Sequence, residues 1–226
     1  MQTDSVQAWW QERWHKDEIG FHLPSVHSWL QTQWLHLTQL GKIKSDACVF
    51  VPLCGKTLDI GYFLSLGHSV VACELSEKAV QQLFSQLQLT PKISTWGQGQ
   101  CYQAEKICVY VGDFFTLTTQ ELAQVDYIYD RAALIALPES TRLQYSQALV
   151  KICPQASMLV ITLDYQQANM SGPPFAVSEL ELQRHYQLAY NIDVLKQKEI
   201  IEKEPRFKQR GLASLIETIL WLEPKI

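Results

Sequence analysis

One short segment of the chain gives the clearest signal of the fold: Val49-Phe50-Val51-Pro52-Leu53-Cys54-Gly55-Lys56-Thr57-Leu58-Asp59. Residues 47–51 are apolar and include β-branched and aromatic side chains, which is typical of a strand buried on both faces of a parallel sheet. Pro52 cannot donate to a sheet ladder, Gly55 gives the backbone freedom to turn, and a helical pattern begins directly afterwards. The segment therefore predicts a strand, a turn and a helix. In an open α/β sheet, such a turn lies where backbone amides can receive a ligand.

Outward from this segment, strand-like and helix-like runs alternate along the chain. The predicted strands are residues 47–51, 69–75, 92–96, 100–103, 107–111, 125–129 and 157–163. The helical patterns cover residues 57–66, the segment capped by Ser76, 132–136, 138–152 and 179–188. Two further strand-like runs, 192–201 and 212–222, follow this alternating series. We therefore predict an α/β fold with a mostly parallel sheet and an antiparallel C-terminal edge hairpin.

The N-terminal region differs from this alternating pattern, because helical spacing dominates it. Residues 4–17 and 25–40 are predicted helices, and Gly41 would end the second one. Three tryptophans fall within six positions of the first helix, at Trp9, Trp10 and Trp14. They are either the core-facing side of that helix or an aromatic lid over a flat ligand.

Composition and charge exclude several classes of protein. The chain has 226 residues, 47% of them hydrophobic, and a formal net charge of −4. It has no Lys/Arg tract, which argues against a nucleic-acid partner bound through phosphate neutralisation. No apolar run reaches a membrane span of roughly 18 residues, and the N-terminus has no apolar core of a signal peptide. We expect a soluble, cytoplasmic protein with no membrane partner.

The cysteines and histidines predict neither disulfides nor a metal centre. The six cysteines contain no C-x-x-C pair, and most lie in apolar strand-like runs. This pattern indicates buried free thiols in a reducing compartment. The six histidines show no metal-ligand spacing, so we predict no metal site.

The turn at Gly55 does not match the common phosphate-binding motifs. A P-loop ending in Gly-Lys-Thr needs a glycine five residues before Gly55, where Phe50 stands, and the G-x-G-x-x-G dinucleotide turn is also absent. However, the second predicted strand ends at Glu74, 19 residues past Gly55. An acidic residue at about this distance accepts from a ribose diol in nucleotide-binding βαβ units. The alternative is a solvated carboxylate at a helix cap.

Two later strand ends extend this interpretation. Gly112 and Asp113 follow one predicted strand, and Asp130 and Arg131 follow another. Asp113 is placed to accept from an exocyclic amine, while Phe114 or Phe115 either packs on an adenine face or belongs to the core. A nucleoside bound through ribose and base, without a glycine cradle for phosphates, points to S-adenosylmethionine.

These motifs together resemble the thiopurine S-methyltransferase family. The resemblance covers nearly the whole chain and rests on Trp10-x-x-x-Trp14, Ile19-Gly20-Phe21-His22, Val51-Pro52-Leu53-Cys54-Gly55-Lys56, Gly67 to Ser76, Gly112-Asp113-Phe114-Phe115, Tyr129 to Pro138, Gly172-Pro173-Pro174-Phe175 and Arg206 to Glu217. It implies a class I S-adenosylmethionine-dependent, Rossmann-like methyltransferase domain over residues 1–226. Within it, residues 1–42 would form a helical cap over the cofactor and residues 43–226 the core. The product of the cofactor would be S-adenosylhomocysteine, and the family favours a monomer.

The resemblance also implies roles for individual residues. In the family, the aromatic N-terminal segment closes over the cofactor, the turn contacts its methionine part, and an arginine lies beside it near the substrate. The matching positions here for cofactor binding are Trp10, Trp14, Phe21, Leu53, Glu74, Gly112, Asp113 and Arg131. Those for catalysis are Arg131, Arg206 and Asp17. Arg206 lies beside Lys208 and Arg210. The alternative to a role in catalysis is therefore that Arg206 belongs to a basic edge that only faces solvent.

The implied reaction needs little from the protein besides alignment. Methyl transfer from a sulfonium is an in-line displacement, and an aromatic thiol is substantially thiolate near neutral pH. A nearby cation such as Arg131 or Arg206 would favour that thiolate, and Asp17 could orient a water or the substrate. The expected substrates are small aromatic or heterocyclic thiols such as thiopurines, with selenium or tellurium compounds as further acceptors.

Two other functions remain open from the sequence. Cys54 stands beside Lys56 at a predicted helix N-terminus, which should lower its pKa and would suit a thiol-dependent redox enzyme or sensor. A cofactor-binding module without catalysis is the other alternative.

Overall fold

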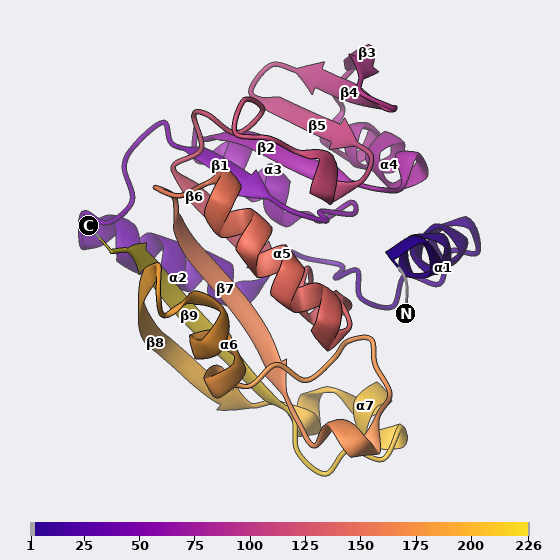
Figure 1. Ribbon diagram of the computed structural model, residues 1–226, viewed down its shortest axis with the longest axis vertical. Coiled ribbons are helices and arrows are strands. Elements are labelled where there is room, and N and C mark those ends of the chain that lie inside the picture. The colour runs from indigo at the N-terminus through magenta and orange to yellow at the C-terminus, as the bar shows by residue number, and fades with distance from the viewer. Residues whose placement is uncertain (1–2, 226) are drawn as a thin grey trace. The chain divides into compact units, whose positions relative to one another are not determined.

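The alternating pattern produces an α/β fold in the computed structural model, which describes residues 3–225 (Figure 1). The chain divides into two compact units, residues 1–126 and residues 127–226. Each unit combines parallel strands with an antiparallel pair at one end of its strand order. The predicted fold class is therefore confirmed.

The first unit is built on three parallel strands. β1 (Cys48–Val51), β2 (Ser69–Glu74) and β5 (Ile107–Val111) lie in the order β5-β2-β1. The antiparallel strands β3 (Lys92–Trp96) and β4 (Gly99–Ala104) continue the sheet beyond β5. All four residues of β1 are buried, as expected for a strand packed on both faces.

The helices of the first unit follow the predicted positions closely. They are α1 (Thr3–His15), α2 (Ser28–Gln39), α3 (Asp59–Ser65), α4 (Glu77–Leu87) and the 3₁₀ turn η1 (Phe114–Thr116). Ser76 caps α4 as predicted, because its hydroxyl accepts from the Ala79 amide. The helix predicted at residues 57–66 begins only at Asp59, so the turn after β1 is longer than the pattern indicated.

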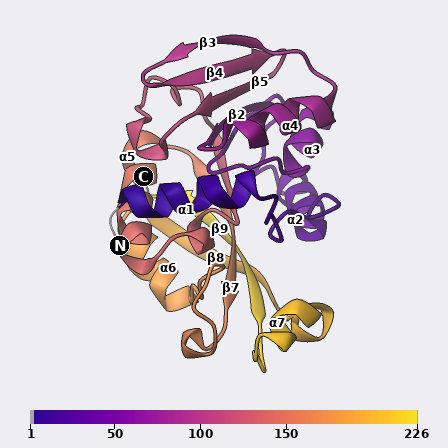
Figure 2. The same cartoon turned by 90° about the vertical axis from the view of Figure 1, so that its right-hand side faces the viewer.

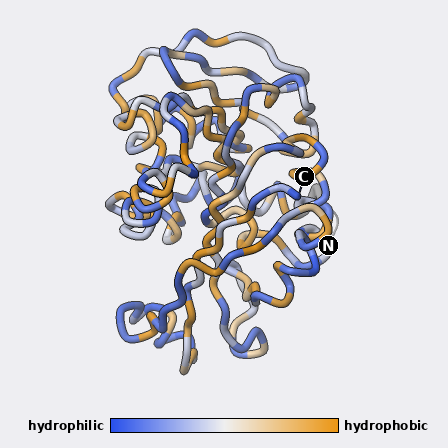
Figure 3. Tube along the Cα trace, turned by 90° about the vertical axis from the view of Figure 1, so that its left-hand side faces the viewer, coloured by the Kyte–Doolittle hydropathy of each residue, from blue (hydrophilic) through white to orange (hydrophobic). Residues whose placement is uncertain are grey.

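The second unit contains the predicted C-terminal hairpin. Its strand order is β6-β7-β9-β8, formed by β6 (Tyr127–Arg131), β7 (Ser157–Asp164), β9 (Ile216–Pro224) and β8 (Tyr190–Glu199). β6 and β7 are parallel, whereas β9 runs antiparallel to both β7 and β8. Figure 3 shows hydrophobic and hydrophilic stretches alternating along the chain.

The helical elements of this unit include three short ones that the sequence did not predict. The full set is η2 (Leu134–Ala136), α5 (Glu139–Ile152), η3 (Gln167–Asn169), α6 (Glu179–Tyr186), η4 (Ile201–Lys203) and α7 (Pro205–Gln209). The three that were not predicted are η3, η4 and α7. α7 was missed because it is too short to show a helical period. It is positioned by a cluster of buried side chains from distant segments: Tyr165, Met170, Ile201, Phe207, Leu212 and Leu215.

The strand predicted at residues 125–129 is displaced by two residues. β6 covers Tyr127–Arg131, so Asp130 and Arg131 are its last residues and do not follow it. Among residues 3–225, no helix combines the length and the apolar character needed to cross a membrane.

Asp130 is a buried carboxylate that joins β6 to the helices after it. Its two oxygens accept from the Leu134 amide at 3.0 Å and from the Tyr145 hydroxyl at 2.7 Å. Burial outweighs these bonds and raises the pKa of Asp130 from 3.8 to about 6. In the folded protein the protonated form therefore predominates only below about pH 6, and the carboxylate predominates above it.

This raised pKa predicts a pH-dependent stability. Because the folded pKa exceeds the unfolded one, the contribution of Asp130 is fully present below 3.8 and is lost as pH rises through about 6. The side chain introduced by Asp130→Asn stays neutral at every pH. Relative to wild type, the free energy of unfolding of Asp130→Asn should therefore rise by about 2.4 kcal/mol between about pH 4 and about pH 7.5. Urea unfolding at both pH values measures this change. Asp193→Asn on exposed β8 serves as the control, and a pH-independent difference for Asp130→Asn would contradict the prediction.

Candidate functional site

The carboxyl ends of three neighbouring parallel strands meet at one edge of the first unit. β2 pairs with β1 on one side and with β5 on the other, and Glu74 lies opposite Val111. The segments that follow these strands are residues 52–58, 75–76 and 112–113. Ligands of open α/β sheets bind at this edge, so the motifs predicted from sequence come together here.

Glu74 connects two of these segments directly. Its Oε2 accepts from the Gly55 amide at 2.7 Å, and its Oε1 accepts from the Ser76 amide at 2.8 Å. The side chain is buried, with 6% exposure. Burial raises the pKa of this carboxyl, while the bonds from Ser76 and Gly55 oppose the rise. A carboxylate has about four acceptor sites, so roughly half of them remain for hydroxyl groups of a ligand.

The turn after β1 has an unusual backbone. Leu53 and Gly55 both adopt left-handed conformations, with φ of 46° and 54°. For a residue with a side chain this conformation costs roughly 1–2 kcal/mol, and such residues cluster at functional sites. The Cys54 amide donates to the Cys73 carbonyl at 3.0 Å, which ties the turn to β2. Leu53 is therefore held in a conformation that needs support from its surroundings.

An aromatic cluster from the N-terminal region lies on this turn. Trp14 is buried, and a Cβ added to Gly55 would lie 2.9 Å from its Cζ2 atom. Phe21 packs edge-on against both Trp14 and Trp10, with ring centroids 5.5 and 5.4 Å apart. The structure thus brings together Trp10, Trp14 and Phe21, with Trp14 as a core residue and Trp10 half-buried.

Lys78 of α4 anchors the end of α1, and the sequence did not indicate this role. Its ammonium donates to the carbonyls of Trp14 and His15 at 3.0 and 3.3 Å and to Asp17 Oδ1 at 2.8 Å. Cations stabilise helix C-termini in this way. The hydrogen bond from Lys78 lowers the pKa of Asp17. Asp17 is thus an exposed ion-pair partner beside the aromatic cluster, and its catalytic role stays a prediction.

The segment after β5 contributes a cap and an aromatic pair. Asp113 Oδ1 accepts from the Phe115 amide at 3.0 Å and so caps η1. Phe114 is 3% exposed and Phe115 36%, which assigns Phe114 to the core and leaves Phe115 to face solvent or a ligand. Gly112 lies against the Trp96 ring, where an added Cβ would be 3.0 Å from Cζ3. The sequence did not single out Trp96.

The expected activation of Cys54 is wrong. The residue lies five positions before α3 begins, so the helix N-terminus does not act on its thiol. Burial, followed by the charge of Glu74, raises the pKa of Cys54 well above its ordinary value. A thiol that resists ionisation is a poor nucleophile at neutral pH.

In the second unit, Arg131 is the last residue of β6. The Gly172–Phe175 loop contacts the segment that follows β6. The Phe175 amide donates to the Ile135 carbonyl at 2.7 Å, and the Tyr165 hydroxyl donates to the Pro174 carbonyl at 2.6 Å. Ala132, directly after Arg131, has a left-handed φ of 62°. The loop is therefore hydrogen-bonded to η2, the turn that follows β6, and to Tyr165.

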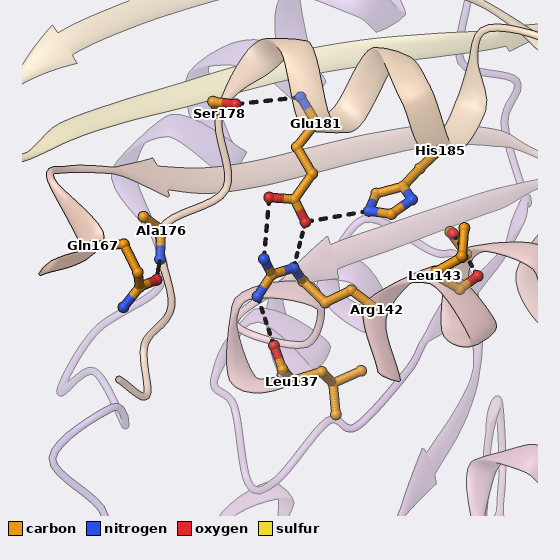
Figure 4. A network of polar contacts seen from close by, with 9 residues as sticks. Leu137, Arg142, Leu143, Gln167, Ala176, Ser178, Glu181 and His185 are labelled. Atoms are coloured by element: carbon orange, nitrogen blue, oxygen red, sulfur yellow. Dashed lines mark hydrogen bonds and ion pairs between the residues drawn. The ribbon is translucent and has the colours of Figure 1, made fainter. Parts of the chain in front are cut away.

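A buried ion pair supports this loop (Figure 4). Arg142 donates from Nε and Nη2 to the two Glu181 oxygens at 2.6 and 3.0 Å and from Nη1 to the Leu137 carbonyl at 2.8 Å. His185 lies 3.2 Å from the same carboxylate. Arg142 is only 4% exposed. Its guanidinium also lies over the Phe175 ring, 5.8 Å from the ring centroid. The sequence did not identify this pair, because Arg142 and Glu181 lie 39 residues apart along the chain.

Arg206 has a different environment from the buried Arg142. It lies on α7, forms an ion pair with Glu204 at 3.2 Å and stacks over the Phe207 ring at 4.8 Å. Its side chain is 48% exposed. These contacts agree with an accessible cation, and its role in substrate binding stays a prediction.

Two solved methyltransferase structures share this fold. A crystal structure of 1,6-didemethyltoxoflavin-N1-methyltransferase from Burkholderia thailandensis, with bound S-adenosylhomocysteine, has a TM-score of 0.62 and 15% identity and covers 98% of this chain and 89% of its own. A methyltransferase from Anabaena variabilis has a TM-score of 0.57 and 13% identity, over 96% and 95% of the two chains. The fold is that of the S-adenosylmethionine-dependent methyltransferases.

Sequence relatives specify the family. The family model "Thiopurine S-methyltransferase (TPMT)" matches residues 5–225. A thiopurine S-methyltransferase of Shewanella oneidensis is 44% identical over 217 residues, which are 96% of this chain and 98% of that protein. One from Pseudomonas fluorescens is 43% identical over 211 residues, 93% and 95% of the two chains. The chain belongs to the thiopurine S-methyltransferase family and is a methyltransferase enzyme that uses S-adenosylmethionine.

The contact between Gly55 and Trp14 predicts a position-specific effect of adding one methyl group. Gly55→Ala should lose roughly 1 kcal/mol of stability to its left-handed backbone, plus about 1–3 kcal/mol because the Trp14 ring must move. Gly97→Ala is the matched control, since its φ of 53° is nearly the same and no atom lies within 4 Å of the added Cβ. Urea unfolding of both variants measures the difference, and equal losses would contradict it.

Proposed function

We propose that this enzyme transfers the methyl group of S-adenosylmethionine to the sulfur of small aromatic or heterocyclic thiols such as thiopurines. The observation that carries the proposal is the Glu74 carboxylate, which is buried at the strand ends yet retains acceptor sites after binding Gly55 and Ser76. The names of the Shewanella and Pseudomonas relatives support the thiopurine class of acceptor.

The cofactor roles in this proposal follow the three segments of the first unit. Glu74 accepts from the ribose hydroxyls, and the strained backbone at Leu53 faces the methionine part. The Gly112 backbone lies beside the adenine, whose exocyclic amine donates to Asp113. Phe115 is better placed than Phe114 to pack on the adenine face, since it is more exposed.

The N-terminal region is proposed to close over the cofactor. Residues 1–42 act as the cap, and residues 43–226 form the core of one methyltransferase domain. Support comes from Trp14, which already packs on the Gly55 turn, and from the ring contacts that join Phe21 to Trp10 and Trp14. The three rings would exclude water from the sulfonium, which favours displacement by a soft nucleophile.

The proposed catalysis relies on alignment and charge. The bound cofactor supplies an activated methyl group. Arg131 and Arg206 stabilise the thiolate form of the acceptor by their positive charge, and Asp17 orients a water or the substrate from its position beside Lys78. No strong general base is needed, because an aromatic thiol ionises near neutral pH. A softer acceptor containing selenium or tellurium would suit the same chemistry.

We also propose that the enzyme acts as a cytoplasmic monomer. All six cysteines are free thiols, which is typical of a reducing compartment.

The proposed function is tested by calorimetric titration with S-adenosylhomocysteine and a methyl-transfer assay on 6-mercaptopurine with the same protein. Binding together with turnover is the expected result. Binding without turnover would overturn the thiopurine acceptor, and a parallel assay with selenite would then test the selenium class. Absence of binding would overturn the cofactor site itself.

Glu74→Gln should weaken binding of S-adenosylhomocysteine by about ten- to a hundredfold, because a charged acceptor for two hydroxyls contributes about 1–3 kcal/mol. Glu77→Gln is the matched control, since this carboxylate lies three positions along the chain and accepts from the Tyr102 hydroxyl at 2.6 Å. Titration calorimetry of both variants gives the affinities, and urea unfolding confirms that each is folded. Unchanged affinity in folded Glu74→Gln would remove this residue from the ribose site.

A further inference from the structure

Two cysteines of the first unit lie in direct contact on neighbouring strands. The Sγ atoms of Cys101 in β4 and Cys108 in β5 are 3.2 Å apart. In this antiparallel pair Cys101 lies opposite Tyr110, and Cys108 is two residues before Tyr110. Side chains two residues apart point to the same face of a sheet, so the cysteines are diagonal neighbours on one face. Both are free thiols.

The face that carries these thiols is not the one packed on α4. Tyr102, next to Cys101, points to the opposite side, where its hydroxyl donates to Glu77 and its ring packs on Phe84 at 5.8 Å. Cys101 and Cys108 are each half-buried, in contrast to the buried Cys54. Figure 2 shows β3, β4 and β5 together at one edge, with α4 beside them. Small molecules therefore have better access to this pair than to Cys54.

The two thiols differ in acidity because they share a hydrogen bond. Donation from the Cys108 thiol, assisted by Ser94, lowers the pKa of Cys101 to about 7 against the effect of burial. The same interaction, followed by burial, raises the pKa of Cys108. At neutral pH a substantial fraction of Cys101 is therefore thiolate, and thiolates are the attacking species in disulfide exchange.

We propose that Cys101 and Cys108 form a redox modification site, which closes to an intramolecular disulfide by exchange with low-molecular-weight disulfides. In the first step the Cys101 thiolate attacks one sulfur of the small disulfide. That S–S bond breaks, a mixed disulfide forms on Cys101, and one small thiolate leaves with the electron pair. Cys108 then loses its proton and attacks Cys101 Sγ, which releases the second small thiolate. The cysteines are oxidised by two electrons, and one small disulfide is reduced to two thiols.

The second step is favoured by the chemistry of the first. Once Cys101 is in a mixed disulfide it no longer carries the charge that raises the pKa of Cys108. The sulfurs must approach by about 1 Å to reach the disulfide bond length of about 2.05 Å. β4 pairs on its outer side with β3, whose first four residues are exposed, so the hairpin can adjust. Tyr110 lies beside the pair and packs on Trp96 at 4.9 Å, which connects the site to Gly112.

The test exposes the reduced, folded protein to glutathione disulfide, quenches with acid, and titrates thiols after unfolding. The expected result is loss of two of the six thiols, their recovery with dithiothreitol, and a peptide map that links Cys101 to Cys108. Cys48→Ser, which replaces another cysteine of the same sheet, should lose two thiols in the same way. Retention of all six thiols in wild type, or a link from Cys101 to Cys48, would overturn the proposal.

Single replacements of the pair separate the two proposed steps. Cys108→Ser should stop at a stable mixed disulfide of glutathione on Cys101, because no second thiol displaces it. Cys101→Ser should react at least about tenfold more slowly, because the remaining thiol lacks the lowered pKa. Mass spectrometry of the intact protein distinguishes these products. A stable mixed disulfide in wild type would overturn the closure by Cys108. Equal rates for both variants would contradict the assignment of Cys101 as the attacking thiol.

Discussion

The interaction on which the first unit depends is the Glu74 carboxylate bound to the Gly55 and Ser76 amides. These donors lie in the turn after β1 and at the start of α4, and Glu74 itself ends β2. One buried charge therefore fixes three segments at the edge of the sheet where ligands bind. Backbone amides compensate its desolvation, so removing the carboxylate would leave two buried donors unsatisfied. The same atoms thus serve the fold and the proposed ribose contact.

The aromatic cluster depends on this arrangement. Trp14 can lie on the turn because Gly55 has no side chain and adopts a left-handed conformation. Lys78 ties the end of α1 to α4, the helix that Ser76 caps. The N-terminal helix is therefore connected to the candidate site at two points, one apolar and one ionic. Exposed ion pairs contribute little stability, so the packing of Trp14 is the stronger of the two connections.

The second unit also places buried charged side chains beside the Gly172–Phe175 loop. Asp130 joins β6 to η2 and α5, while Arg142 and Glu181 join α5 to α6. Buried pairs are not reliably stabilising compared with apolar packing, but loss of one partner is costly. Their consequence here is geometric, because Arg142 also binds the Leu137 carbonyl and lies over Phe175. The Gly172–Phe175 loop is thereby held against the segment between β6 and α5.

The sequence by itself determined the alternating α/β pattern, the turn at Gly55, the cap at Ser76 and the family, because each depends on local spacing or on contiguous motifs. It did not determine α7, whose position comes from buried side chains of distant segments. It also misjudged Cys54, since the pKa of a thiol depends on burial that local sequence does not report. Lys78, Arg142 and the contact between Cys101 and Cys108 were decided only by the tertiary structure. Their partners are brought together by strand pairing and helix packing, and no pattern along the chain encodes those distances.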